Sequence, residues 1–247
     1  MQKPYLSVVI PAYNEAVNFR NGVLNEPLEY LRMQKYTWEM IFVDDGSTDD
    51  TYKLLSGLTT KNIRVLQIPH GGKAAAVTAG VLAAKGDYIL FTDFDQSTPI
   101  DQVEKFLSAH KSGEDIVTGV RVKTEQDTLF RKIRSWAYVT LVQLIVLPEL
   151  KDSQCGFKSF TNPAAKKIFG NLLISLPTGE IKGPYMGAWE VEVFFLAKKF
   201  GFKIDQVPVR WIKYLSDRLN PWRDPLYMFR DTLKVRLYDI LGKYDQV

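Results

Sequence analysis

The sequence has little cysteine, little histidine and little excess charge. Cys155 is the only cysteine among the 247 residues, so no internal disulfide can form and a reducing compartment is favoured. With only two histidines and no Cys/His cluster, we do not expect a zinc site. The formal net charge is +4 and the basic residues are spread along the chain, so we expect no binding to nucleic acid.

Long hydrophobic runs are missing as well. The longest apolar stretch, at 136–147, contains Gln143 and is followed by Pro148. It is shorter than the roughly 20 residues that cross a bilayer. A strand pattern begins a few residues after Met1, which leaves no room for a secretory signal. We therefore expect the protein to face the cytosol.

The composition, 46% apolar and 24% charged, is that of an ordinary globular protein, and we expect residues 1–247 to form one domain. In the first half, apolar runs typical of buried strands alternate with helical patterns. The predicted strands are 6–10, 38–43, 63–68, 88–91 and 115–118, and the predicted helices are 16–33, 49–58, 73–84 and 100–110. Repeated βα units predict an α/β fold with a mostly parallel, Rossmann-like sheet flanked by helices.

After Arg121 this alternation stops. The remaining predicted elements are a helix at 128–147, a loop through Phe160, a helix at 163–169, an irregular segment at 177–187, a helix at 190–199, a strand at 204–211 and a C-terminal amphipathic helix at 225–241. We interpret Pro208 as a proline in an edge strand. Cys155 is expected to be a small packing residue and not a nucleophile, because no motif places a histidine beside it.

Acidic side chains follow two of the predicted strands. Asp93 and Asp95 come directly after the fourth strand, and Asp44 and Asp45 follow the second. The carboxyl ends of parallel strands form the edge where such sheets bind ligands. Two carboxylates one residue apart can hold a hard cation, Mg²⁺ or Mn²⁺, that bridges a diphosphate. Taken alone, each segment is also consistent with a solvated turn or a helix cap.

These strand ends, together with the segment 11–15 after the first strand, resemble the inverting glycosyltransferases of family 2, which bind a sugar nucleotide on a GT-A fold. Gly72-Lys73-Ala74 is similar to the family's Gly-Lys-Gly segment, with Ala74 in place of the last glycine. The segments 152–158 and 189–192 resemble the dolichyl-phosphate β-glucosyltransferase branch. The resemblance implies that residues 1–122 bind the nucleotide sugar and that 123–247 form the acceptor and membrane-proximal half.

The resemblance also implies particular roles. The nucleotide sugar would be bound by Pro11, Tyr13, Glu15, Asp44, Asp45, Lys73 and Asp93, and the metal by Asp93 and Asp95. Which of Asp44 and Asp45 contacts the base stays open. Asp49 is expected to cap the helix that follows.

Charge on the departing diphosphate requires a fixed cation. Lys73, at the start of a helix, and Arg121, in a Gly-x-Arg match, are the candidates. Glu190 and Glu192 are two residues apart on a helix and do not share a face, so one should point into the site. By resemblance this is Glu190, which together with Asp95 and Arg121 forms the predicted catalytic set. The alternative for Glu190 is a charge that complements the helix dipole.

A phosphate monoester is largely ionised at neutral pH, so Glu190 need only orient the acceptor or hold the metal. Arg218 and Arg131 are predicted to contact the acceptor phosphate. On the C-terminal helix, Leu226, Phe229, Leu233, Leu237 and Ile240 form one stripe flanked by Lys234 and Arg236. The stripe either enters a membrane interface or packs on the domain.

We therefore expect a metal-dependent, inverting transfer of glucose from UDP-glucose to a polyprenyl or dolichyl monophosphate. The predicted location is the cytoplasmic side of a membrane, either peripheral or anchored by spans absent from this chain, with a second copy as a possible partner. The alternatives are a mannosyl- or other hexosyltransferase, a soluble sugar acceptor, or a non-catalytic sugar-nucleotide-binding module for membrane recruitment. A nucleotidyltransferase is disfavoured because 11–15 is not a Gly-rich phosphate loop.

Overall fold

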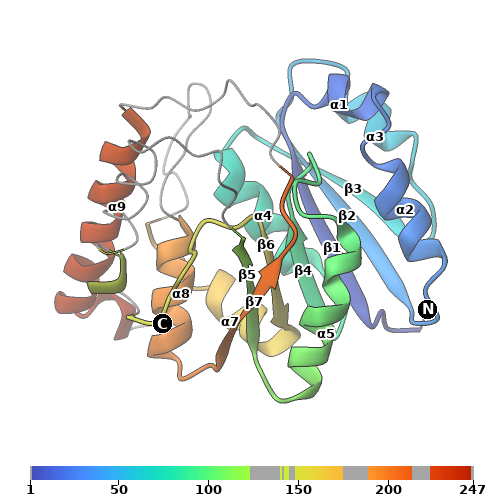
Figure 1. Cartoon of the computed structure of the whole chain (residues 1–247). Coiled ribbons are helices and arrows are strands. Elements are labelled where there is room, and N and C mark those ends of the chain that lie inside the picture. Colours follow the sequence, from blue (N-terminus) through green and yellow to red (C-terminus); the bar gives the residue numbers. More distant parts are fainter. Residues whose placement is uncertain are drawn as a thin grey trace.

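The computed structural model describes residues 2–122, 140, 142–144, 148–174, 189–212 and 223–245, without the side chains of 223–226. Seven strands of this described part form one sheet in the order β3-β2-β1-β4-β6-β5-β7 (Figure 1). The strands are β1 Leu6–Ala12, β2 Trp38–Asp45, β3 Ile63–Ile68, β4 Tyr88–Thr92, β5 Ile116–Arg121, β6 Phe157–Thr161 and β7 Ile204–Val209. The helices are α1 Ala16–Arg20, α2 Asn25–Arg32, α3 Thr51–Ser56, α4 Gly72–Ala83, α5 Val103–Lys111, α7 Asn162–Phe169, α8 Trp189–Lys199 and α9 Arg223–Ile240, with short 3₁₀ helices η1 Ile100–Gln102 and η2 Lys243–Asp245.

The prediction of a mostly parallel sheet is confirmed, with one strand missed. Strands β1 to β4 pair in parallel, and so do β5 and β7. Strand β6 lies antiparallel between β4 and β5, at the middle of the sheet. The expectation of a loop through Phe160 was therefore wrong. Its polar residues, Lys158 and Ser159, are fully buried, so the segment lacks the apolar pattern that indicates a central strand.

The single helix predicted at 16–33 is two helices. Helix α1 ends at Arg20, and Gly22 follows with a φ of +74° before α2 begins. A residue in this left-handed conformation interrupts helical hydrogen bonding, and glycine adopts it without steric cost. The break places α1 beside the carboxyl end of β1, where the first loop of the site begins (Figure 1). The edge position of Pro208 on β7 is confirmed, because β7 is the last strand of the sheet.

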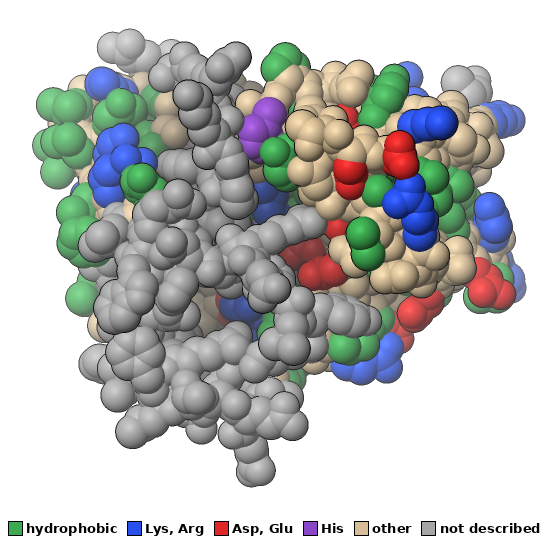
Figure 2. Space-filling view, turned by 90° about the horizontal axis from the view of Figure 1, so that it is seen from above, with side chains coloured by type: hydrophobic (Ala, Val, Ile, Leu, Met, Phe, Trp, Pro, Cys, Tyr) green, Lys and Arg blue, Asp and Glu red, His purple; other side chains and the backbone are tan. Residues whose placement is uncertain are grey.

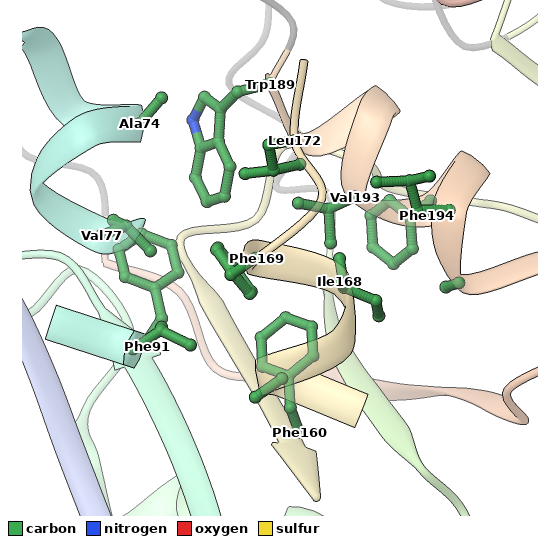
Figure 3. Close-up of a cluster of buried hydrophobic side chains, with 14 of the residues drawn as sticks. Ala74, Val77, Phe91, Phe160, Ile168, Phe169, Leu172, Trp189, Val193 and Phe194 are labelled. Atoms are coloured by element: carbon green, nitrogen blue, oxygen red, sulfur yellow. The ribbon is translucent and has the colours of Figure 1, made fainter. Parts of the chain in front are cut away.

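Helices cover both faces of the sheet and give two cores. On one face, side chains of α4, α7 and α8 meet those of β4 and β6 (Figure 3). The indole of Trp189 packs edge-on against Phe91, with ring centroids 5.6 Å apart. On the other face, helices α2, α3 and α5 pack on alternate strand residues, and the ring of Phe106 lies 5.0 Å from that of Phe157. Because successive side chains of a strand point to opposite faces of the sheet, one strand can contribute to both cores.

Helix α9 packs along α8 at one side of the molecule (Figure 1). Its buried residues are Asp231, Thr232 and Val235, whereas Phe229, Leu233, Leu237 and Ile240 are exposed. The alternative in which this stripe packs on the domain is therefore wrong for these four residues, and the side chain of Leu226 is outside the described part. Within the described ranges, no helix combines the length and hydropathy that crossing a bilayer requires.

Most of the helix predicted at 128–147 and the irregular segment predicted at 177–187 lie outside the described residues. So do Arg131 and Arg218. Their proposed contacts with the acceptor phosphate stay predictions.

Candidate active site

The carboxyl ends of β1, β2 and β4 meet at one edge of the sheet, and the candidate residues follow them. Strand β1 is paired with β2 so that Ala12 lies opposite Asp44, and it is paired with β4 along its other side. Figure 2 views this edge from above and shows acidic side chains gathered in a hollow of the surface. The topology thus brings together sequence segments that are tens of residues apart.

The loop after β4 holds two carboxylates in a fixed turn. Gln96 has a φ of +52° and donates from its backbone N and its Nε2 to the carbonyl of Asp93, at 3.2 and 2.8 Å. The backbone N of Ser97 donates to Oδ1 of Asp95 at 2.9 Å. The second carboxylate oxygen of Asp95 has no hydrogen bond or ion pair within the described part of the chain. One oxygen of Asp95 thus fixes the turn and the other is available to a ligand.

Gly156, just before β6, packs directly against this loop. A Cβ on Gly156 would overlap the carboxylate of Asp93, so only glycine permits this approach. Beside it, Cys155 is fully buried, and its Sγ lies 2.7 Å from where a Cβ on Gly119 would stand. Burial raises the pKa of the Cys155 thiol, which disfavours the reactive thiolate. The prediction that Cys155 is a packing residue is confirmed.

Lys73 reaches the same carboxylate from the first turn of α4. Its Nζ lies 2.6 Å from Oδ1 of Asp93 and 5.2 Å from the ring centroid of Phe91. Burial alone would lower the pKa of Lys73, but the carboxylates of Asp93, Glu190 and Asp95 raise it above its ordinary value. Lys73 is therefore a cation at neutral pH, held where negative charge gathers.

Helix α8 places its two acidic residues on different sides, as predicted. Glu192 accepts hydrogen bonds from the backbone N of Leu173 at 2.7 Å, from that of Ile174 at 3.0 Å and from the hydroxyl of Tyr244 at 2.7 Å. Glu190 is 6% exposed. Burial raises its pKa, while the charges of Lys158 and Lys73 oppose that shift. Glu192 anchors the fold, and Glu190 belongs to the charged cluster.

Lys158 is a member of this cluster that sequence reasoning missed. It is fully buried on β6, where its Nζ donates to the carbonyl of Cys155 and lies 5.8 Å from the ring centroid of Phe194. Burial lowers its pKa, and the nearby charges of Glu190 and Asp152 work against that shift. The available sequence signal was a single lysine in the segment 155–160, whose other residues are small or apolar.

Arg121 is held by Asp152. Its Nε and one terminal nitrogen donate to the two carboxylate oxygens at 2.7 and 3.0 Å, and its guanidinium lies 5.5 Å from the ring centroid of Trp211. Burial alone would raise the pKa of Asp152, but these hydrogen bonds and the charge of Arg121 hold it below its ordinary value. Within the described ranges the other terminal nitrogen of Arg121 has no acceptor, so it can donate to a ligand, because a guanidinium carries five N–H groups.

The structure distinguishes Asp44 from Asp45. Asp45 uses both oxygens: Oδ1 accepts from the backbone N of Gly71 at 2.7 Å, and Oδ2 lies 2.9 Å from Nδ1 of His70. Asp44 is fully buried, and its Oδ2 lies 3.3 Å from its donors, Ser47 N and Gln67 Nε2. Its Oδ1 has no hydrogen-bond partner among the described residues. Asp45 therefore fixes the loop before α4, and Asp44 keeps a spare acceptor.

The remaining donor-side candidates line the loop after β1. The ring of Tyr13 stacks on His70, with centroids 4.2 Å apart and planes 15° from parallel. Glu15 is 7% exposed, and its backbone N donates to Thr51 Oγ1 at 2.7 Å. Asp49 accepts from the backbone N of Thr51, the first residue of α3, at 2.9 Å, and from that of Ala16 at 3.2 Å. Asp50, and not Asp49, is the N-cap residue of α3, but the Asp49 carboxylate binds the first backbone N–H of that helix and ties the starts of α3 and α1 together.

A doubly covered, mostly parallel sheet with acidic loops at the carboxyl ends of its strands defines an α/β protein of the class that binds ligands at this edge. Residues 7–169 match the model of glycosyl transferase family 2. The chain belongs to this family and is a glycosyltransferase.

Its relatives include the dolichyl-phosphate beta-glucosyltransferase of Dictyostelium discoideum, which is 32% identical over 96% of this chain and 76% of that protein. The Homo sapiens enzyme of the same name is 30% identical over 97% of this chain and 77% of that protein. The predicted family and branch are thus confirmed.

Solved structures share the fold at lower identity. Mannosyl-3-phosphoglycerate synthase from Rubrobacter xylanophilus aligns with a TM-score of 0.66 and 15% identity, over 99% of this chain and 76% of that one. Glucosyl-3-phosphoglycerate synthase from Mycobacterium tuberculosis, in complex with Mn²⁺, UDP and glucosyl-3-phosphoglycerate, aligns with a TM-score of 0.62 and 19% identity, over 97% and 80% of the two chains. The predicted GT-A fold is confirmed by this likeness.

Proposed function

We propose that this glycosyltransferase moves glucose from UDP-glucose to a polyprenyl or dolichyl monophosphate, with inversion at the anomeric carbon, at the cytosolic face of a membrane. The names of its relatives support the sugar and the acceptor. The observation that carries the chemistry is the cluster of Lys73, Asp93 and Glu190 beside Asp95, because it joins a fixed cation to carboxylates where a diphosphate and an acceptor phosphate would meet.

The spare acceptor of Asp44 supports a uridine donor. Uracil offers one imide N–H between two carbonyls, and a single carboxylate oxygen matches that donor. A buried acceptor left without a partner is costly, so occupying Oδ1 of Asp44 would favour nucleotide binding. The adjacent stacked pair of Tyr13 and His70 forms an apolar, aromatic wall of the kind that nucleotide bases pack against.

The donor set of the loop after β4 fits a divalent cation. Asp93 and Asp95 supply hard carboxylate oxygens from a turn fixed by Gln96, and one oxygen of Asp95 is uncommitted. Such ligands suit Mg²⁺ or Mn²⁺, which when bound would neutralise the diphosphate. Lys73 is already paired with Asp93. It would add positive charge beside the leaving diphosphate whether or not Asp93 also binds the cation.

The acceptor phosphate needs little activation, since its second pKa is near 6. We assign Glu190 to orienting the acceptor side, because it is buried and the charges of Lys158, Lys73 and Asp93 all act on it. Arg121, fixed by Asp152, keeps N–H groups to direct at a phosphate oxygen. Attack from the side opposite the departing UDP then gives inversion.

A screen of nucleotide release tests the donor. We expect release of UDP from UDP-glucose in the presence of a short polyprenyl phosphate to exceed release of GDP from GDP-mannose at least ~10-fold, about 1.4 kcal/mol of differential transition-state binding. Equal release from both nucleotides would contradict the donor. Release that requires a soluble sugar in place of the lipid phosphate would contradict the acceptor.

A further inference from the structure

The outward side of α9 is apolar. We define the outer α9 face as Phe229, Leu233, Leu237, Ile240 and Leu241, whose exposed fractions are 46%, 44%, 51%, 74% and 59%. Their spacing places them on one side of the helix. The opposite side, which packs on the domain, includes the polar residues Asp231, at 4% exposed, and Thr232, at 0%. A surface helix normally has the reverse arrangement, so an apolar face of this kind indicates a docking surface.

Basic side chains surround the outer α9 face. Arg230, Lys234 and Arg236 border it. The described carboxylates of the helix are paired with basic groups: Asp231 lies 2.9 Å from Arg230, and Asp239 lies 2.9 Å from Lys199 and 3.0 Å from Arg236. Asp245, in the turn after the helix, is paired with Lys199 at 2.6 Å. Figure 2 shows hydrophobic and basic side chains side by side along this flank of the molecule.

A groove continues the basic border toward α8. It has a volume of about 390 Å³, and its lining includes Lys198, Lys199, Arg236 and Leu144. Leu144 is 81% exposed, so it extends the apolar surface across the groove from α9. The groove is also lined by Asp239, which pairs with Lys199 and Arg236, so its three basic groups outnumber its carboxylate. A net basic groove beside apolar residues suits an anionic headgroup whose acyl chains lie on those residues.

We propose that the outer α9 face is a membrane-docking surface, which enters the interface of a bilayer containing anionic lipids while Arg230, Lys234 and the groove contact headgroups. Charge complementarity selects this occupant, because a second copy of the chain would bring two basic borders together. The proposal deepens the proposed function, since it states how the enzyme approaches the membrane that carries its acceptor. The docking itself requires neither substrate.

Co-sedimentation with vesicles tests the surface. We expect the wild-type chain to bind phosphatidylcholine vesicles only when they contain phosphatidylserine, and to be released by salt. Leu233→Asp should lower the bound fraction at least ~10-fold, because a charge on the apolar face opposes insertion. Leu82→Asp on α4 is the matched control, since both leucines are 44% exposed, and it should bind like the wild type. Lys234→Glu should weaken binding most at low salt.

A fluorescent label gives a second readout that does not depend on losing binding. Cys155 is fully buried, so a thiol-reactive, environment-sensitive dye would react selectively with Leu233→Cys or Leu82→Cys. Anionic vesicles should shift the emission to the blue at position 233 and leave it unchanged at position 82. No shift at 233, or equal shifts at both positions, would overturn the proposal.

Two further outcomes separate this inference from its rivals. A wild-type dimer that Leu233→Asp converts to a monomer without vesicles would assign the outer α9 face to a second copy and overturn the proposal. Turnover with a water-soluble, short-chain polyprenyl phosphate should be unchanged in Leu233→Asp. Vesicle binding by the wild type without any turnover would leave the docking surface standing and remove the proposed function.

Discussion

At the scale of residues, the site depends on a few close approaches between segments that are distant in the sequence. Asp93 from β4 meets Lys73 from α4 and Gly156 from the turn before β6. The sequence motifs predict a role for Asp93 and Lys73, because each lies in a recognisable pattern. They give no role to Gly156, since the reason for that glycine is the neighbouring carboxylate, which only the folded chain brings near.

Asp95→Asn should abolish transfer and leave the fold intact. The substitution removes one hard anionic ligand from the loop but keeps an oxygen to accept from Ser97. Steady-state UDP release and circular dichroism measure the two effects, with Asp101→Asn, which lies on η1, as the control. Excess chelator should act on the wild type as the substitution does. Full turnover by Asp95→Asn, or by chelated wild type, would rule out the metal mechanism.

Glu190→Gln should lower kcat with little change in the KM for UDP-glucose, because we assign this side chain to the acceptor side. Glu192→Gln is the matched variant, because Glu192 lies two residues further along α8 on a different side of the helix. It should keep the chemical rate and lose about 1 kcal/mol of unfolding free energy. The amide Oε1 can still accept from the two backbone N–H groups and Tyr244, but without the charge of the carboxylate. Lost donor binding with an unchanged kcat in Glu190→Gln would reassign it.

Gly156→Ala should reduce turnover strongly, because the added methyl group would displace the carboxylate of Asp93. Gly57→Ala, whose Cβ would meet only the Leu54 carbonyl at 3.3 Å, is the control. Turnover and metal-dependent UDP binding are the measurements. If Gly156→Ala retained wild-type values for both, the position of Asp93 would not matter as we describe.

At the scale of elements, the parallel strands could be predicted and the antiparallel strand could not. Strands β1, β2 and β4 contain near-continuous apolar runs, which is the pattern of a sheet buried on both faces. Strand β6 contains Lys158 in a fully buried position, and its pairing with β4 and β5 supplies an environment that the local sequence does not reveal. The stripe of α9 was visible as a pattern, but periodicity gives an apolar face and not its direction.

The ion pair between Arg121 on β5 and Asp152, in the segment before β6, should make the free energy of unfolding depend on pH. Asp152 has a folded-state pKa below its ordinary value of 3.8, so its pairing with Arg121 stabilises the protein fully above about pH 4. This stabilisation is lost as pH falls below that value. Asp152→Asn should cost about 1–3 kcal/mol near neutral pH and less toward pH 3. Urea unfolding at several pH values measures it, and a cost that did not shrink in acid would contradict the assignment.

At the scale of the whole molecule, we propose two distinct functional surfaces on the described chain. One is the edge where the strands β1, β2 and β4 end, with its cluster of carboxylates and lysines. The other is the outer α9 face, with apolar residues bordered by basic ones. A transferase that joins a water-soluble nucleotide sugar to a lipid phosphate needs both kinds of surface, and the two predictions about them can fail independently.

Formation of the lipid-linked product tests the central claim most directly. The protein is incubated with UDP-glucose, a divalent cation and a short polyprenyl phosphate, and the extracted lipid is analysed by mass spectrometry and by NMR of its anomeric proton. We predict a polyprenyl phosphate that carries one hexose in the β configuration, formed in equal amount with UDP and absent with Asp95→Asn. An α-linked product, or UDP released without any glycosylated lipid, would contradict the account.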